Sequence, residues 1–131
     1  MRENICEDFQ ETVREYLIRH QSILDIISKS QETNAYISRA LTKAITQCGC
    51  IELNSKKINL PESSTISDIK DAYNSQLKGN LCSTCSEIIE QELGKNLFYI
   101  VALCNALELD LEDILLKENK KVKALGRFNC T

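Results

Sequence analysis

Two short cysteine pairs constrain the fold of this 131-residue chain more than any other feature of its sequence. Cys48 and Cys50 form a C-x-C pair in TQCGCIELN, and Cys82 and Cys85 form a C-x-x-C pair in LCSTC. Four thiolates in two close pairs suit a zinc ion, which takes tetrahedral sulfur ligands at about 2.3 Å. The sequence therefore predicts a zinc site that pins the intervening segment, 51–81, as an insertion.

We expect this zinc to be structural, because four protein ligands leave no open position for water or substrate. Gly49 gives the first pair the backbone freedom that a tight chelating turn needs. Thr84-x-x-Glu87 resembles a capping box, which predicts Thr84 before a helix and Cys85 in its first turn. A redox pair, an iron–sulfur ligand set and buried thiols without a metal remain open alternatives.

The other cysteines lack close partners in the sequence. Cys104 lies in an apolar run and is expected in the core, whereas Cys6 and Cys130 stand alone. The odd total of seven does not suit a framework of disulfides.

Charge and hydropathy exclude several classes of protein. The net charge of −3 argues against general nucleic-acid binding, which needs a basic surface. The amino terminus MRENICED lacks the apolar stretch of a secretory signal, and the longest apolar run, LFYIVALC, is too short to cross a bilayer. We therefore expect a cytoplasmic protein that does not interact with membranes.

Helical periodicity runs through most of the chain, which has only four glycines and one proline. Apolar spacing predicts one amphipathic helix from Ile5 to Ile27 and a second, after a break near 28–30, that ends at the first cysteine pair. Residues 51–64 have the composition of a loop. The fold expected is all-α, a bundle of about four or five helices in a single domain, 1–131, with a zinc-clamped loop insertion.

The motifs Thr65-x-x-Asp68 and Asp110-x-x-Asp113 predict the starts of two further helices, the first short and the second ended by Gly126. Between them, the strongest helical pattern runs from about Cys85 to Leu107. Its apolar positions predict a buried stripe, formed by Ile89, Leu93, Leu97, Ile100, Cys104 and Leu107.

Polar residues on this long helix also share a face, since Glu92, Lys95, Asn96 and Tyr99 fall at i, i+3, i+4 and i+7. Such groups need partners or a ligand, or they lie on a solvent-facing edge. Gly94 costs about 1 kcal/mol relative to alanine in a helix, which indicates that something approaches closely there.

The segment IIEQELGKNLFYIVALCNALELDLEDILLKENKKV resembles the last two helices of the MazG-like nucleotide pyrophosphohydrolases. The similarity covers about the last third of the chain, and the helix around QETNAYISRALTKAI matches more loosely. The resemblance implies an all-α fold, a homo-oligomer, and magnesium-dependent cleavage of nucleoside triphosphates. It also implies a metal site made of an E-x-x-E pair on an earlier helix and an E-x-x-D pair on the later one.

Carried over to this sequence, the resemblance places Glu92 and Glu32 at two of the family's four carboxylates. Lys95 stands where the later aspartate is expected and Ala35 where the second early glutamate is expected. At an effective dielectric of about 20, a lysine about 6 Å from a divalent ion is repelled by roughly 5 kcal/mol. The incomplete set therefore indicates impaired catalysis.

Three functional hypotheses follow. The first is a non-catalytic, zinc-stabilised MazG-like module that binds nucleotide or protein. The second is an active pyrophosphohydrolase, in which Glu92 and Glu32 hold one magnesium ion, Lys95 binds a phosphate, and Lys120 or Lys123 contacts the rest of the triphosphate. The third is a zinc-containing regulatory bundle unrelated to nucleotides. The Glu92 face should line an inter-helix cleft under the first two and face open solvent under the third.

Overall fold

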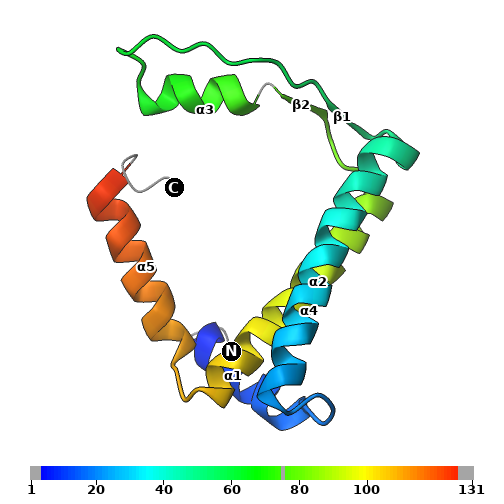
Figure 1. The fold of residues 1–131 in the computed structure, drawn as a ribbon, viewed down its shortest axis with the longest axis vertical. Coiled ribbons are helices and arrows are strands. Elements are labelled where there is room, and N and C mark those ends of the chain that lie inside the picture. The colour runs from blue at the N-terminus through cyan, green and yellow to red at the C-terminus, as the bar shows by residue number, and fades with distance from the viewer. Residues whose placement is uncertain (1–3, 75, 127–131) are drawn as a thin grey trace. The chain divides into compact units, whose positions relative to one another are not determined.

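The computed structural model describes residues 4–74 and 76–126, and Cys130 lies outside this part. It confirms the predicted helical fold, with five α-helices and one small sheet in the described residues (Figure 1). The elements are α1 (Ile5–Tyr16), α2 (Ile23–Lys43), a π-helical turn (Ala44–Cys48), β1 (Ile51–Leu53), α3 (Ile66–Asn74), β2 (Leu77–Gly79), α4 (Ser83–Ala106) and α5 (Leu111–Leu125). Within the described part, no helix combines the length and apolar character needed to cross a bilayer.

The chain divides into two compact units. Unit 1 comprises the chain up to Tyr36 together with the chain from Gln91 onward, and unit 2 is the continuous segment Ile37–Glu90. The predicted insertion, 51–81, therefore lies entirely in unit 2, and the helices α2 and α4 each contribute residues to both units.

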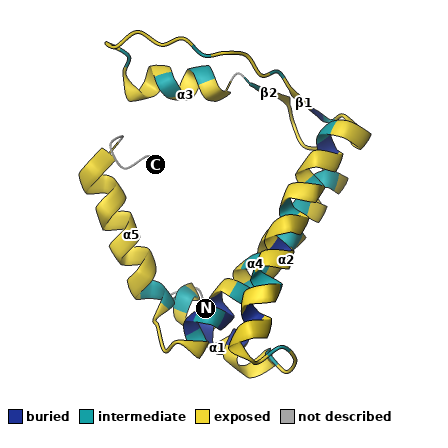
Figure 2. Ribbon diagram, in the orientation of Figure 1, coloured by how far each residue is buried: buried dark blue, intermediate teal, exposed yellow. Residues whose placement is uncertain are grey.

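The core of unit 1 is small and lies where α1, α2 and α4 meet. Its fully buried members are Val13, Ile26, Val101 and Ala102, and they are surrounded by partly buried Phe9, Leu17, Phe98, Leu103 and Leu111 (Figure 2). Buried Gln10 adds polar contacts, because its side-chain amide donates to the Leu109 carbonyl at 2.8 Å and accepts from the Leu111 amide at 3.0 Å. This one side chain holds the end of the α4–α5 connection that leads into α5.

The first helix ends earlier than the sequence predicted, at Tyr16 rather than near Ile27, so the predicted break at 28–30 is wrong. The chain turns at 17–22, where His20 adopts a left-handed conformation (φ 59°). Ser22 then begins α2: its carbonyl accepts from the Ile26 amide at 2.9 Å and its hydroxyl accepts from the Asp25 amide at 3.2 Å. The motif Ser22-x-x-Asp25 was the signal for this start.

Two predicted caps are confirmed. Thr65 and Asp68 form the reciprocal bonds of a capping box at the start of α3, at 3.0 and 3.1 Å, and Asp110 accepts from the Asp113 amide at the start of α5. Helix α3 ends at Asn74.

The apolar stripe predicted to be buried on α4 is largely uncovered. Leu93, Leu97 and Ile100 are 40–53% exposed, while the buried residues of α4 are Val101, Ala102 and Cys104. The helix packs on α1 and α2 through a neighbouring face, so the sequence identified apolar positions without showing which of them would be covered within this chain.

Candidate metal centre

The first cysteine pair lies where α2 ends. The π-helical turn closes with a hydrogen bond from the Gly49 amide to the Ala44 carbonyl at 2.9 Å, one residue wider than an α-helical bond. Gly49 has a left-handed conformation, with φ 78° and ψ 10°, as is common directly after a helix. This reversal separates Cys48, the last residue of the turn, from Cys50, and it confirms the expected use of Gly49.

A two-stranded antiparallel ladder links the first pair to the second. Ile51 pairs with Gly79 and Glu52 with Lys78, so the chain leaving Cys50 runs beside the chain approaching Cys82. Gly79 has φ 87°, and a Cβ on it would lie 2.6 Å from the Cys50 carbonyl oxygen. Only glycine allows the two strands to approach this closely beside the thiols.

The second pair lies at the start of α4, where Cys82 caps the helix. The Cys82 carbonyl accepts from the Ser86 amide at 2.9 Å, and its sulfur accepts from the Cys85 amide at 3.4 Å. The predicted capping residue, Thr84, is therefore wrong by two positions, because the Cys82 sulfur takes the place of the usual hydroxyl. Cys85 does lie in the first turn, as predicted.

All four predicted metal ligands converge, since the Sγ atoms of Cys48, Cys50, Cys82 and Cys85 lie within 4.8 Å of one another. The Cys48 and Cys82 sulfurs are 3.8 Å apart, too far for a disulfide, whose S–S bond is about 2.05 Å. Four sulfurs about 2.3 Å from a central zinc ion would be separated by roughly 3.8 Å, the edge of the tetrahedron. The observed spacing fits a four-thiolate metal site.

The pKa values within the cluster differ strongly. The Cys85 backbone amide and thiol donate to the Cys82 sulfur and lower the pKa of Cys82 to about 7. The same contact raises the pKa of Cys85 to about 12, since its thiol proton is shared with Cys82 and since partial burial disfavours a second thiolate. Without a cation the cluster thus favours one thiolate over four, whereas a divalent ion would stabilise all of them.

Unit 2 has little else to hold it together. Its buried residues in the described part are Ala44 and Ile51, and α3 has none. A segment of this size without a substantial core usually depends on a metal or disulfides. The thiol cluster is therefore placed where unit 2 most needs a cross-link.

The remaining described cysteines are separate from this centre. Cys104 is buried, as predicted, and burial raises the pKa of its thiol, which keeps it protonated. Cys6 is partly exposed on α1. Among residues 4–74 and 76–126, the four-cysteine cluster is the only group of three or more potential metal ligands.

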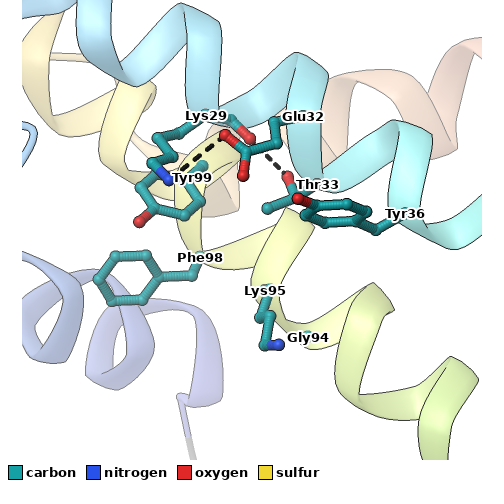
Figure 3. Close-up of a pocket in the computed structure, with 8 residues that line it drawn as sticks. All are labelled: Lys29, Glu32, Thr33, Tyr36, Gly94, Lys95, Phe98 and Tyr99. Carbon is teal, nitrogen blue, oxygen red and sulfur yellow. Dashed lines mark hydrogen bonds and ion pairs between the residues drawn. The ribbon is translucent and has the colours of Figure 1, made fainter.

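A second candidate site is a cavity of about 530 Å³ in unit 1, between α2 and α4 (Figure 3). Eight residues line it: Lys29, Glu32, Thr33, Tyr36, Gly94, Lys95, Phe98 and Tyr99. Gly94 lies at its wall, and no atom of another described segment lies within 4 Å of where a Cβ would be, so the described part of the chain does not supply the close approach expected there. The cavity combines two ammonium groups with three aromatic rings.

The predicted polar face of α4 is divided between this cavity and contacts with α2. Lys95 and Tyr99 line the cavity, whereas the Asn96 amide donates to the Ser30 carbonyl at 3.0 Å and to the Thr33 hydroxyl at 3.1 Å. The Glu92 side chain is 18% exposed, and its Oε2 is buried with no hydrogen-bond partner among the described residues. A buried carboxylate oxygen without a partner is costly, which makes Glu92 a position where a donor or cation would be stabilising.

The two predicted magnesium ligands are each paired with a lysine on their own helix. Glu32 lies 3.3 Å from the Lys29 ammonium, and Glu92 lies 3.6 Å from that of Lys95. Glu32 lines the cavity, but Glu92 is not among its lining residues. Lys120 and Lys123 are exposed on α5, and neither lines the cavity.

Sequence reasoning missed several residues of both sites. Lys29, Thr33 and Tyr36 line the cavity from α2, and their spacing of i, i+4 and i+7 was a readable signal of one shared face. At the metal centre, the missed residue is Gly79, and its signal was a glycine three positions before the C-x-x-C pair.

Comparison with known protein families, with curated proteins and with solved structures found no match for this chain. The assignment of function therefore depends on the chemistry of the two sites.

Proposed function

We propose that this chain is a zinc-stabilised helical protein, in which one Zn²⁺ ion bound by four thiolates holds unit 2 together. The observation that carries the proposal is the convergence of the four Sγ atoms within 4.8 Å, with one pair at the 3.8 Å edge expected for zinc. Four thiolates fill a tetrahedral ion, so its role is structural.

Metal analysis of the purified protein tests this assignment. We expect one zinc per chain in protein purified under reducing conditions without added metal, and close to none in a Cys82→Ser variant. Bound iron would identify the iron–sulfur alternative, and a metal-free protein containing a Cys48–Cys82 disulfide would identify the redox alternative. Either result would contradict the zinc proposal.

We further propose that unit 1 is a non-catalytic module, MazG-like in type, that binds a nucleotide in the cavity between α2 and α4. The lining chemistry supports this: Lys29 and Lys95 can contact phosphates, and the rings of Tyr36, Phe98 and Tyr99 offer surfaces for a base. The lysine partners of Glu32 and Glu92 argue against a magnesium site, because each ammonium already pairs with its carboxylate and only Glu32 lines the cavity.

Calorimetric titration with nucleoside triphosphates, with and without magnesium, tests binding, and an assay for released pyrophosphate tests catalysis. We expect binding without turnover. Lys95→Ala should weaken binding about tenfold through loss of a phosphate contact, and Gly94→Leu should block the cavity, whereas Lys120→Ala on α5 should change nothing. Pyrophosphate release would support the active pyrophosphohydrolase. Absence of binding across the panel would favour a partner-binding bundle unrelated to nucleotides.

A further inference from the structure

Cys48 is the residue of the candidate metal centre that is most open to solvent. It is exposed, whereas Cys50, Cys82 and Cys85 are partly buried. Cys48 is the last residue of the π-helical turn, and the left-handed Gly49 follows it. Because oxidation of a thiolate depends on its exposure, a small oxidant from solvent should attack Cys48 before the other three.

A second thiol lies beside Cys48, where it can form a disulfide with it. The Cys48 and Cys82 sulfurs are 3.8 Å apart, and a disulfide requires them to close to about 2.05 Å. Cys48 precedes a glycine, and Cys82 directly precedes α4, so both lie at the end of a regular element rather than inside one. Their disulfide would join two segments that are distant in the sequence.

We propose that the metal centre is a peroxide-responsive switch, in which hydrogen peroxide converts Cys48 and Cys82 into a disulfide and the zinc ion is released. This inference rests on the zinc site proposed above and adds its regulation. After oxidation only Cys50 and Cys85 remain as zinc ligands. Two thiolates leave half of the tetrahedral positions to water, so the ion is lost to any competing chelator.

The reaction balances in two steps. The Cys48 thiolate attacks a peroxide oxygen, so an S–O bond forms, the O–O bond breaks and hydroxide leaves, which gives a sulfenic acid. The Cys82 thiolate then attacks the Cys48 sulfur, so the S–S bond forms and a second hydroxide leaves. In total the two thiolates lose two electrons to the peroxide, and two protons from solvent convert the hydroxides to water.

The disulfide would preserve one part of unit 2 and loosen another. Residues 48 and 82 flank the ladder formed by Ile51–Leu53 and Leu77–Gly79, so the new bond replaces zinc as the link across the two strands. The Cys85 amide, by contrast, donates to the Cys82 sulfur at 3.4 Å and would lose a charged acceptor, since a disulfide sulfur is neutral. Oxidation should therefore weaken the first turn of α4 while β1 and β2 stay paired.

Treatment of the full, zinc-loaded chain with hydrogen peroxide tests the switch. Zinc content is measured first, released zinc is followed with a metal-binding dye, and disulfides are located by mass spectrometry after alkylation of the free thiols. We expect one zinc ion released for each Cys48–Cys82 disulfide, and reduction in the presence of zinc should restore the bound ion. Hydrogen exchange should become faster at the Cys85 amide but not at Ile51–Leu53.

Two histidine variants test the role of Cys48 while keeping four ligands, because zinc also binds three cysteines and one histidine. Cys48→His removes the exposed sulfur, whereas Cys50→His retains the Cys48–Cys82 pair. Zinc release by peroxide should be at least about tenfold slower from Cys48→His than from Cys50→His. Cys6→Ser lies outside the cluster and should behave as the wild type.

The outcomes separate this inference from the proposed function. A wild-type chain that carries no zinc before oxidation would overturn both. A zinc-loaded chain that keeps its ion in peroxide, or loses it with a different disulfide or with a sulfinic acid at Cys48, would overturn the switch alone. Equal rates of release from Cys48→His and Cys50→His would do the same.

Discussion

The sulfur atoms of Cys48 and Cys82 lie 3.8 Å apart although 34 residues separate them along the chain. Few apolar contacts in unit 2 oppose the separation of these segments, because Ala44 and Ile51 are its only buried residues in the described part of the chain. In the zinc-bound protein that we propose, the free energy of metal binding is then a large part of the free energy that orders this unit.

Removal of the metal should loosen unit 2 selectively. Structural zinc contributes about 10–16 kcal/mol in zinc-finger peptides, as much as the whole stability of a typical domain, about 5–15 kcal/mol. After chelation under reducing conditions, hydrogen exchange should show loss of protection at Ile51–Leu53 and Leu77–Gly79. Protection around Val13 and Val101 should persist, since their packing does not involve the metal. Unchanged protection at both strands after verified removal would contradict a structural role.

Cys82 caps α4 and is also a proposed zinc ligand, and its replacement by serine should separate these two roles. Serine is a good helix-capping residue, so α4 should still begin at Ser83, but its hydroxyl is a poor zinc ligand. We expect loss of bound zinc and a fall in melting temperature of at least about 10 °C, measured by metal analysis and calorimetry. Cys6→Ser is the matched control, because Cys6 lies on α1 outside the cluster, and it should retain both zinc and stability.

The contact of Cys85 with the Cys82 sulfur is local to the start of α4 and does not need the strands β1 and β2, so the metal-free protein should lose its first cysteine proton with a pKa of about 7, that of Cys82. This pKa is below the ordinary value of 9.0, so the Cys82 thiolate stabilises the folded metal-free state above about pH 9. That stabilisation declines as the pH falls and is lost below about 7. Titration of the thiolate absorbance of the chelated protein should show this transition, and Cys82→Ser should abolish it. A transition that persists in the variant would assign the low pKa to another thiol.

Two glycine-to-alanine changes should have opposite effects. Gly79→Ala should lower the free energy of unfolding by about 2 kcal/mol or more, because φ is 87° and the new Cβ would meet the Cys50 carbonyl. Gly94→Ala should raise it by about 0.5–1 kcal/mol, because Gly94 is helical with open space at its Cβ position. Chemical denaturation measures both changes, and a neutral Gly79→Ala would show that the ladder can shift at little cost.

The four cysteines of the candidate metal centre could be predicted from the sequence because each pair is local, and a local turn needs only a few residues to form. The starts of α3 and α5 were predictable for the same reason, since Thr65 with Asp68 and Asp110 with Asp113 form their bonds within one turn. The end of α1 was not predicted, because Leu17 and Leu24 lie seven residues apart and so keep the helical period across the polar residues 19–22.

The uncovered apolar stripe on α4 shows that burial is harder to predict from the sequence than helix formation is. Leu93, Leu97 and Ile100 have the spacing of core residues, but periodicity does not say whether their cover comes from the same chain. The cavity has the same limit. Lys29 lines it, and Asn96 bonds the Ser30 carbonyl 66 residues away, only because α2 and α4 pack side by side in one particular register. That register is set by packing, which single-helix patterns do not encode.

The hydrogen bonds of Gln10 to residues 99 and 101 positions later bear on how the chain acquires its structure during synthesis. Unit 2 is one continuous segment, so it can close around the proposed zinc ion as soon as Glu90 has left the ribosome. In unit 1, by contrast, α1 reaches its final contacts only after α4 and the connection to α5 have been made. Through that interval the apolar side of α1 has no lasting cover, and it is the part of the nascent chain with the greatest need of a chaperone.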